Sequence, residues 1–401
     1  MSSIETSVVI VGAGPAGLLL GRLLGLAGID NLVLELRTRR YIEERIRAGL
    51  LEHPTVELLG IAGVDDHLRR DGQFDEGFEL RFEGERVWFP TAELTGGQQT
   101  VLYPQQEVVK DLLRARDTSG EPIVFEALDV ALHNLDTERP QVTYRDADGA
   151  EHVITADYVA GCDGFHGVSR SAVPQTLRTE FQHDYPFGWL GILAEVPPST
   201  RELIYAHHDH GFAMHSRRSP TLSRLYLQVE PDCDAATVPD EFIWDELTRR
   251  LATQDGWTLH RGPIVQKSVT AMRSFVVEPL QYKRLFLAGD AAHIVPPTAA
   301  KGLNLAASDI SVLSEALMDH YRTGNDELLA NYSTTALRRI WRAQEFSRHM
   351  TALLHHVPGQ EFERRLQRAR LQNLVISRSA QASFSELYVG IPFEGKPERF
   401  L

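Results

Sequence analysis

A glycine-rich turn near the start of the chain constrains the fold most strongly. Residues 7–11 form a short β-branched run, which is typical of a buried parallel strand. Gly12, Gly14 and Gly17 follow in a G-x-G-x-x-G spacing that opens a helical segment. A second apolar run closes on Glu35, about 20 positions further on. The pattern predicts a βαβ unit that binds a dinucleotide.

Each residue of this fingerprint has a physical task. Gly12 permits the tight turn, Gly14 lets the backbone approach a pyrophosphate, and Gly17 lets the helix pack closely on the strand. Glu35 is expected to accept hydrogen bonds from a ribose. The alternative is a glycine-rich turn in an ordinary βαβ unit. The glycines alone do not decide between the two, but the strand, the helix and the acidic residue together favour dinucleotide binding.

A second loop, residues 288–304, follows an apolar strand-like run and precedes a helical pattern that starts near Leu305. Asp290 places a carboxylate at the carboxyl edge of a sheet, which is where open α/β sheets bind ligands. Pro296 and Pro297 fix two φ angles and stiffen the loop. We predict that the loop lies against a flat ligand. The alternative is a βα connection without a binding role.

Composition and length exclude several classes of protein. A chain of 401 residues predicts two domains or one large composite. No apolar run approaches the ~20 residues of a membrane span, and the first residues do not read as a signal peptide. Cys162 and Cys233 are too few for a disulfide framework, and no Cys/His cluster has zinc spacing, so we expect no metal and a cytoplasmic location. The net charge of −14 argues against nucleic acid, but not against a small anionic substrate.

The pattern divides the chain into three segments of an α/β protein. Residues 1–170 read as the first part of a Rossmann-type domain, and residues 171–282 as an inserted β-rich substrate domain. Residues 283–401 are expected to complete the first domain and to continue as a helical C-terminal region. Smaller elements include a hairpin at 78–89, helices at 105–113 and 240–251, a helix start at 50–52, and a loop at 388–392.

One predicted strand pair of the middle segment carries several polar side chains. Residues two apart in a strand share a face, which places Arg224, Tyr226 and Gln228 together, and Ser216 with Arg218. A solvated outer face is the more common case, because arginine is rarely buried. The alternative is a pocket for a carboxylate, which the guanidinium fork binds bidentately.

Three motifs now stand in a fixed order: the glycine fingerprint, Asp163-Gly164, and Gly289-Asp290. This set resembles that of the single-component, FAD-dependent aromatic hydroxylases, and the resemblance runs over nearly the whole chain. It implies FAD as cofactor, NADPH or NADH and O2 as co-substrates, and a homodimer. The substrate it implies is 4-hydroxybenzoate, converted to 3,4-dihydroxybenzoate. In the implied cycle, NAD(P)H reduces FAD, and a flavin hydroperoxide then delivers oxygen beside the phenolate.

The resemblance also implies roles for individual residues. FAD is expected to contact Gly12, Gly14, Gly17, Glu35, Arg45, Arg47, Ala48, Gly49, Leu50, Gln105, Asp163, Asp290, Leu303 and Asn304. The substrate is expected among Tyr205, Ser216, Arg217, Arg218, Tyr226 and Pro297, of which Ser216 and Arg218 hold the carboxylate. Tyr205, Tyr388 and Pro297 are the expected catalytic residues, and Arg224 the residue of flavin mobility. NAD(P)H is expected at Arg37, Tyr41, Arg45, His166 and Arg273.

Two alternatives keep the same cofactor. A sister hydroxylase would use the scaffold for another phenolic acid. A flavin-bound redox protein without hydroxylation would need the glycine fingerprint and Asp290, but not Tyr205, Ser216 and Arg218 together.

The chain departs from the family at a few positions. Asp75 stands where the best-known members have a histidine at the outer end of the proton relay. An exposed aspartate has a pKa of about 4 and is a poor match to a phenol, which leaves the exit route of the proton open. Pro104 and Ala299 replace glycines, and we expect both to be tolerated. Leu36 replaces the family's first arginine in the nucleotide-preference stretch, so both NADPH and NADH stay open.

Overall fold

One sheet of the protein is built around the predicted βαβ unit. The computed structural model describes residues 2–45 and 49–401. Its first eight-stranded sheet has the order β17-β18-β11-β1-β2-β8, with β10 and β9 attached to β11. The strands are β1 (Ser2–Val11), β2 (Asn31–Glu35), β8 (Ile123–Phe125), β9 (Leu128–His133), β10 (Gln141–Arg145), β11 (Glu151–Gly161), β17 (Gln281–Tyr282) and β18 (Leu285–Leu287). Because β1 pairs in parallel with both β2 and β11, the predicted Rossmann-type arrangement is confirmed.

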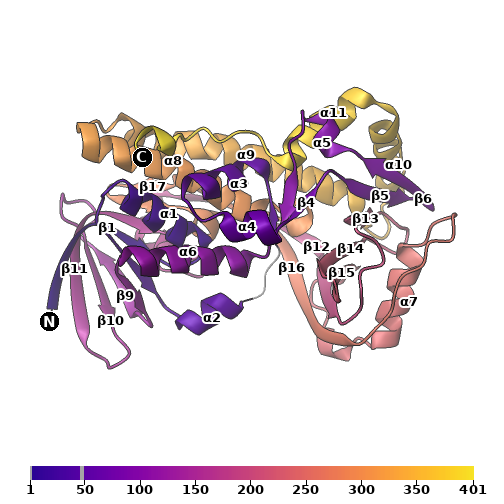
Figure 1. The fold of residues 1–401 in the computed structure, drawn as a ribbon, viewed down its shortest axis with the longest axis horizontal. Helices are drawn as coiled ribbons and strands as arrows, with labels where there is room; N and C mark the ends of the chain where they lie inside the picture. Colours follow the sequence, from indigo (N-terminus) through magenta and orange to yellow (C-terminus); the bar gives the residue numbers. More distant parts are fainter. Residues whose placement is uncertain (1, 46–48) are drawn as a thin grey trace.

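Helices cover this sheet and continue towards the other half of the molecule (Figure 1). They are α1 (Pro15–Leu26), α2 (Arg39–Glu44), α3 (His53–Ile61), α4 (Asp66–Asp71), α6 (Gln105–Ser119), α8 (Lys301–Thr323) and α9 (Glu327–Leu354). The helix expected near Leu305 begins four residues earlier, because Ala300 takes a left-handed conformation and ends the preceding turn. The helix expected to start at 50–52 begins at His53 with Glu52 as its N-cap, because Leu50 and Leu51 pair with another strand.

A second eight-stranded sheet forms the other half, in the order β19-β16-β12-β15-β14-β13-β5-β6. Its strands are β5 (Phe78–Phe82), β6 (Glu85–Phe89), β12 (Thr179–Ala194), β13 (Ile204–Ala206), β14 (Ala213–Ser219), β15 (Leu222–Val229), β16 (Ile264–Glu278) and β19 (His293–Ile294). Helices α5 (Thr91–Leu94), α7 (Asp240–Arg250), α10 (Glu361–Ile376) and α11 (Arg378–Val389) lie in this half (Figure 1). The hairpin predicted at 78–89 is confirmed, and it belongs to this sheet.

The division at residues 170 and 282 stays a prediction about folding units. In the structure, residues from the first predicted segment contribute β5 and β6 to the second sheet. The long strand β16 also pairs with β19, which follows it across the predicted boundary. The chain therefore passes between the two halves more than once.

A small third sheet lies beside the second one. It consists of β3 (Leu50–Leu51), β7 (Thr100–Leu102) and β4 (Gln73–Asp75), in the order β3-β7-β4. An aromatic core that includes Phe78, Trp189, Tyr205, Phe384 and Tyr388 fills the space between the second sheet and the C-terminal helices. The small third sheet carries β4, and the aromatic core joins β13 to α11, so these three elements border the same part of the molecule.

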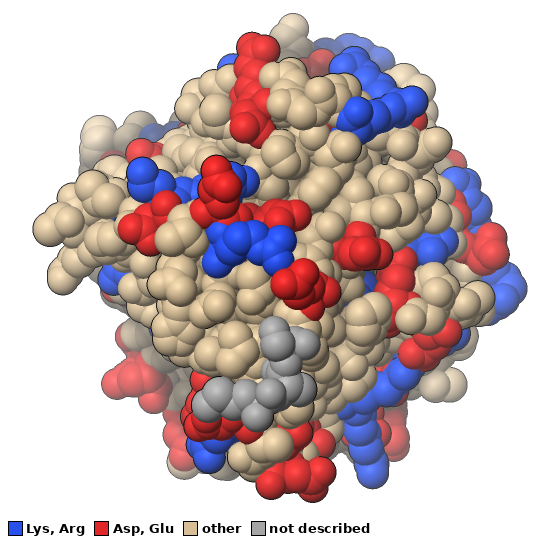
Figure 2. All heavy atoms as spheres, turned by 90° about the vertical axis from the view of Figure 1, so that its left-hand side faces the viewer, with Lys and Arg blue, Asp and Glu red and all other residues tan. Residues whose placement is uncertain are grey.

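Charged side chains of both signs are dispersed over the end of the molecule that carries β9, β10 and β11 (Figure 2). The net charge of −14 is therefore not gathered into one acidic field on that face. Among the described residues, no helix has both the length and the apolar character needed to cross a membrane.

Candidate active site

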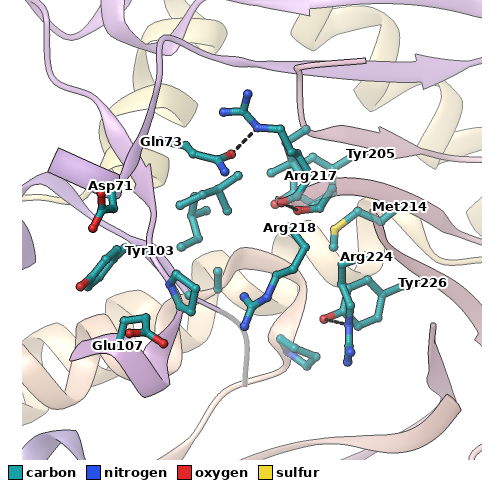
Figure 3. A pocket seen from close by; sticks show the side chains of 18 of the residues that line it. Asp71, Gln73, Tyr103, Glu107, Tyr205, Met214, Arg217, Arg218, Arg224 and Tyr226 are labelled. Atoms are coloured by element: carbon teal, nitrogen blue, oxygen red, sulfur yellow. Dashed lines mark hydrogen bonds between the residues drawn. The ribbon is translucent and has the colours of Figure 1, made fainter. Parts of the chain in front are cut away.

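A cavity of about 500 Å³ lies between the second sheet and the small third sheet. Its wall includes all six predicted substrate residues, Tyr205, Ser216, Arg217, Arg218, Tyr226 and Pro297, and also Arg224, the residue predicted for flavin mobility. Figure 3 shows three arginines entering from β14 and β15, with Asp71, Tyr103 and Glu107 across the space. The face that carries Ser216 and Arg218 is thus a cavity wall rather than an outer surface.

The arginines of this wall have neutral hydrogen-bond partners. Arg217 donates to the side-chain oxygen of Gln73, and Arg218 donates to that of Gln106 over 3.2 Å. Burial and the neighbouring Arg224 charge lower the pKa of Arg218, although a guanidinium stays charged at any physiological pH. A half-buried cation held by an amide can still bind a substrate carboxylate. The cavity wall is therefore suited to binding the carboxylate of an acidic substrate.

The predicted grouping on β15 is correct for two of its three residues. Arg224 donates to the Tyr226 hydroxyl over 3.2 Å, and both side chains line the cavity. Gln228 instead accepts hydrogen bonds from the backbone of Phe212 and His356, and it donates to the carbonyl of His356. Its side chain ties three segments together and does not form part of the cavity wall.

Two buried tyrosines meet beside the cavity. The hydroxyl oxygens of Tyr205 and Tyr388 are 3.3 Å apart, and each residue is only 2% exposed. Burial raises the pKa of both phenols, so they stay neutral and can pass a proton along a hydrogen bond. The expectation of a loop from residue 388 onward is wrong at its start, because Tyr388 lies in the last turn of α11 and is thereby held rigidly.

Asp75 is buried, which corrects the expectation of an exposed aspartate. It is 8% exposed, because it lies in strand β4 and pairs with Thr100 of β7. Burial raises the pKa of Asp75 to about 7, against the opposing effect of the Arg217 and Arg201 charges. At neutral pH this carboxyl group therefore exchanges readily between its two protonation states.

The glycine fingerprint forms a cradle that fits a pyrophosphate. Gly12 has a φ of +105°, which only glycine adopts without strain, and its N–H donates to the carbonyl of Leu34. A Cβ on Gly17 would collide with the backbone of Gly12, whereas the space around Gly14 is open. No side chain caps the start of α1, where Pro15 occupies the first turn. The free N–H groups of a helix start favour an anion such as a phosphate.

Carboxylates border this cradle. One oxygen of Glu35 accepts the backbone N–H of Ala13 and the other accepts that of Arg37, each over 2.8 Å. Asp163 accepts hydrogen bonds from Ser169 with one oxygen, while its other oxygen is buried without a protein partner among the described residues. Asp290 follows β18 in a short 3-10 turn, Gly289–Ala291. These residues fit the hydroxyl-rich parts of FAD.

The loop before α8 is fixed by polar side chains. Asn304 donates to the carbonyls of Leu50 and Ala300 and accepts the N–H of Glu52. This arrangement holds Leu50 against the start of the helix. The replacements Pro104 and Ala299 are accommodated, since neither position has the positive φ that would require glycine.

Other predicted FAD residues lie around the same region. Gly49 and Leu50 line the cavity, Gln105 begins α6, and Leu303 is half-buried in the first turn of α8. Arg45 is exposed at the end of α2. Arg47 and Ala48 lie outside the described residues.

The residues predicted for NAD(P)H form two groups. The guanidinium groups of Arg37 and Arg45 lie 5.4 Å and 5.9 Å from the centre of the Tyr41 ring. His166 and Arg273 both contact Phe165, the first edge to face and the second over the ring. Each group combines at least one arginine with an exposed or half-exposed aromatic ring. Their part in nucleotide binding stays a prediction.

Several cavity residues were not predicted from the sequence. Trp189, Met214 and Leu203 supply apolar surface, and Tyr103 closes one side. The indole N–H of Trp189 donates to a buried His355 nitrogen over 2.6 Å, which fixes the ring at the cavity wall. One sequence feature could have indicated Met214: it lies two residues before Ser216 and therefore shares its strand face.

A parallel nucleotide-binding sheet beside a cavity of phenols and guanidinium groups defines a flavoprotein that acts on an aromatic acid. The family described as FAD binding domain matches residues 5–347. The p-hydroxybenzoate hydroxylase of Acinetobacter baylyi is 45% identical over 402 residues, covering 100% of this chain and 99% of that protein. The chain therefore belongs to the FAD binding domain family, and the predicted resemblance to FAD-dependent aromatic hydroxylases is confirmed.

More distant relatives agree with this assignment. A probable NADH-specific resorcinol 4-hydroxylase of Rhodococcus jostii is 26% identical over 351 residues, covering 81% of this chain and 61% of that protein. The crystal structure of p-nitrophenol 4-monooxygenase PnpA from Pseudomonas putida superimposes with a TM-score of 0.83 at 21% identity, covering 97% of this chain and 98% of that one. At that identity the superposition shows the shared fold.

Proposed function

We propose that this enzyme hydroxylates 4-hydroxybenzoate to 3,4-dihydroxybenzoate and consumes NAD(P)H and O2. One observation carries the proposal: a single cavity is lined by Arg218 and by Tyr205, whose hydroxyl lies within hydrogen-bond distance of the buried Tyr388 hydroxyl. The named activity of the relative from Acinetobacter baylyi, at 45% identity over the whole chain, supports it.

The carboxylate of the substrate would be held by Arg218 and Ser216. A guanidinium binds a carboxylate through two parallel hydrogen bonds, which fixes the direction of the aromatic ring as well as its position. The Ser216 hydroxyl lies on the same strand face and donates to the carbonyl of Arg217 over 3.3 Å, a weak interaction that a carboxylate can replace. The ring would then extend from β14 into the cavity.

The phenol end would meet the buried tyrosines. A phenol ring is a strong carbon nucleophile only as its phenolate, so the enzyme must remove the hydroxyl proton. Tyr205 lines the cavity and its hydroxyl can accept that proton while passing its own to Tyr388. Because burial keeps both tyrosines neutral, the relay moves a proton without placing a charge on either ring.

FAD, when bound, supplies the storage of reducing equivalents and the activation of O2 that amino-acid side chains cannot provide. The residues that would hold it are those of the glycine cradle, Glu35, Asp163 and Asp290. The loop that carries Pro297 forms part of the cavity wall, and Trp189 adds apolar surface. These groups restrict water around the reacting ring, which protects the reaction from wasteful side products.

The experiment is a coupling assay with the purified FAD-loaded enzyme. We expect 4-hydroxybenzoate to accelerate NAD(P)H oxidation, with one molecule of 3,4-dihydroxybenzoate formed for each NAD(P)H, as measured by chromatography. Rapid oxidation that yields hydrogen peroxide alone would contradict the proposal. The 2- and 3-hydroxy isomers serve as matched controls, and preferential turnover of one of them would identify a sister hydroxylase instead.

NADH and NADPH are compared in the same assay. The arginines near Tyr41 suit a 2′-phosphate, whereas Leu36 is exposed and apolar. The proposal admits either nucleotide, and the ratio of kcat/KM values for the two decides between them.

We also propose a homodimer that works in the cytoplasm. Phe362 and Ile376 of α10 are 74% and 82% exposed, and large apolar side chains of this kind are candidates for burial between subunits. Light scattering coupled to gel filtration tests the dimer. A monomer at micromolar concentration would contradict it.

A further inference from the structure

The turn that carries Asp290 lies where the chain passes between the two large sheets. It follows β18, which pairs with β11 in the first sheet, and it precedes β19, which pairs with β16 in the second. Asp290 is half-buried in this turn and is one of the carboxylates proposed above to hold FAD. The contacts that hold the two ends of the turn therefore set where this carboxylate lies.

One carboxylate oxygen of Asp309, in α8, contacts both ends of the turn. It accepts the backbone N–H of Gly289 over 2.9 Å, directly before Asp290, and it pairs with the imidazole Nε2 of His293 over 2.6 Å. The side chains of His293 and Asp309 are both buried, and each residue is only 1% exposed. Residues 289–293 are therefore held against the helix as a closed loop.

The turn also lies against the start of α1, which opens the pyrophosphate cradle. Gly289 has a φ of +64°, and a Cβ built there would lie 3.4 Å from the Cβ atoms of Ala16 in α1 and Ala306 in α8. The turn is thus in close contact with both helices. A displacement of the turn would change where Asp290 lies relative to the cradle.

The buried pair is costly for a purely structural role. Its surroundings in α8 are apolar, because Leu305, Ala306 and Ile310 belong to the main hydrophobic core. The second oxygen of Asp309 is buried and has no hydrogen-bond partner within the part of the chain that the structure describes. Burying a half-satisfied carboxylate costs free energy that a neutral acceptor for the Gly289 N–H would avoid. A group retained at such a cost is a candidate for a functional role.

We propose that Asp309 and His293 are positioning residues that hold the Asp290 turn in the geometry that binds FAD. This inference rests on the FAD contact proposed above for Asp290, and it does not depend on the identity of the aromatic substrate. The carboxylate restrains the start of the turn and the imidazole restrains its end. A binding group must be held within about 0.5 Å of its productive position, so a turn released at one end binds FAD less tightly.

The test measures the affinity of the enzyme for FAD. The FAD-loaded enzyme is diluted stepwise, and the FAD that it releases is measured by its fluorescence, which gives the dissociation constant. For Asp309→Asn we expect FAD to bind about ten- to a hundredfold more weakly, the range expected for the loss of hydrogen bonds to a charged group.

Two comparisons separate positioning from a general loss of structure. His293→Gln keeps an N–H that can donate to Asp309 and should bind FAD nearly as tightly as the parent, whereas His293→Leu should weaken binding as Asp309→Asn does. Asp319→Asn is the matched control and should leave the dissociation constant unchanged. Asp319 is also buried in α8, but it accepts hydrogen bonds from Thr323 and Asn325 at the far end of that helix.

A double variant tests whether Asp309 acts through Asp290. Asp290→Ala removes the proposed contact itself, so adding Asp309→Asn to it should weaken FAD binding by no more than about a further twofold. If the two effects multiply instead, Asp309 supports the FAD site independently of Asp290, and the inference is overturned.

Other outcomes also decide the matter. An unchanged dissociation constant for Asp309→Asn, or equal values for His293→Gln and His293→Leu, would overturn the inference. If Asp290→Ala alone leaves FAD binding unchanged, the contact proposed for Asp290 fails and the inference falls with it. The coupling assay with 4-hydroxybenzoate judges the proposed hydroxylation independently, so the two failures are distinguished.

Discussion

Replacing Asp75 by asparagine should stabilise the protein, and the gain should grow with pH. The pKa of Asp75 rises from an ordinary value of 3.8 to about 7 in the folded protein because the side chain is buried. Between these two values the unfolded chain has already lost the proton while the folded protein retains it. Stability therefore falls as pH rises through this window, and the loss is complete above pH 7.

The magnitude follows from the size of the shift. Three pKa units at 1.36 kcal/mol each give a penalty of about 4 kcal/mol above pH 7. At pH 5 the penalty is only about 1.5 kcal/mol, because it grows with pH between the two pKa values. The gain in free energy of unfolding from Asp75→Asn should therefore be about 3 kcal/mol larger at pH 8 than at pH 5. The comparison between the two pH values cancels any pH-independent effect of the new amide.

Thermal unfolding of the FAD-loaded proteins measures this difference. For a chain of this length, about 3 kcal/mol corresponds to a change of about 3 °C in the Tm difference between variant and parent. Glu76→Gln is the matched control, and its Tm difference should be equal at both pH values because that side chain is exposed. An Asp75→Asn difference that stays constant from pH 5 to pH 8 would refute the reasoning, since Asp75 would then titrate as it does in the unfolded chain.

Three further predictions concern the cavity wall. Tyr205→Phe should keep substrate affinity and lower hydroxylation by about a hundredfold or more, since it removes the hydroxyl that joins the substrate to Tyr388; unchanged product formation would exclude Tyr205 from the relay. Arg218→Lys should weaken 4-hydroxybenzoate binding roughly ten- to a hundredfold, because an ammonium lacks the bidentate fork; equal dissociation constants by fluorescence titration would place the carboxylate elsewhere. Arg217→Gln removes a charge that lowers the pKa of Asp75, so the decrease in Tm with rising pH that Asp75 causes should extend to higher pH than in the parent; an unchanged pH dependence of the Tm would show that Arg217 does not act on Asp75.

The nucleotide-binding half could be predicted from the sequence because its signals are local. Gly12 and Gly17 are required by contacts within one βαβ unit, and Glu35 lies at the end of the next strand of that unit. A turn that only glycine can form, followed by a helix and a strand, leaves few alternatives for the backbone. The strand that ends before Asp290 could be predicted for the same reason, because its apolar run and the following turn are also local signals.

The cavity could be predicted only in part, because burial depends on contacts between distant segments. The period-two pattern on β14 and β15 placed Arg218 and Arg224 correctly, but it could not show that Gln228 is taken up by the backbone of His356. The helix expected to start at 50–52 begins at His53, because Leu50 and Leu51 pair with the strand β7, which lies about fifty residues later in the sequence. Asp75 was expected to be exposed because it is an acidic residue in a polar stretch, and its burial comes from pairing with Thr100 of β7, which is distant in the sequence.

The burial of Asp75 makes the stability of this region depend on pH. A carboxylate that titrated at its ordinary value would impose no penalty on folding. A carboxylate buried without any nearby cation would remain protonated at neutral pH. Arg217 moderates the effect of burial on the pKa of Asp75, and its own guanidinium is anchored by Gln73 on the same strand as Asp75. The positions 73, 75 and 217 therefore act as one unit, and an aspartate at position 75 is expected to ionise near neutral pH only where position 217 supplies a cation.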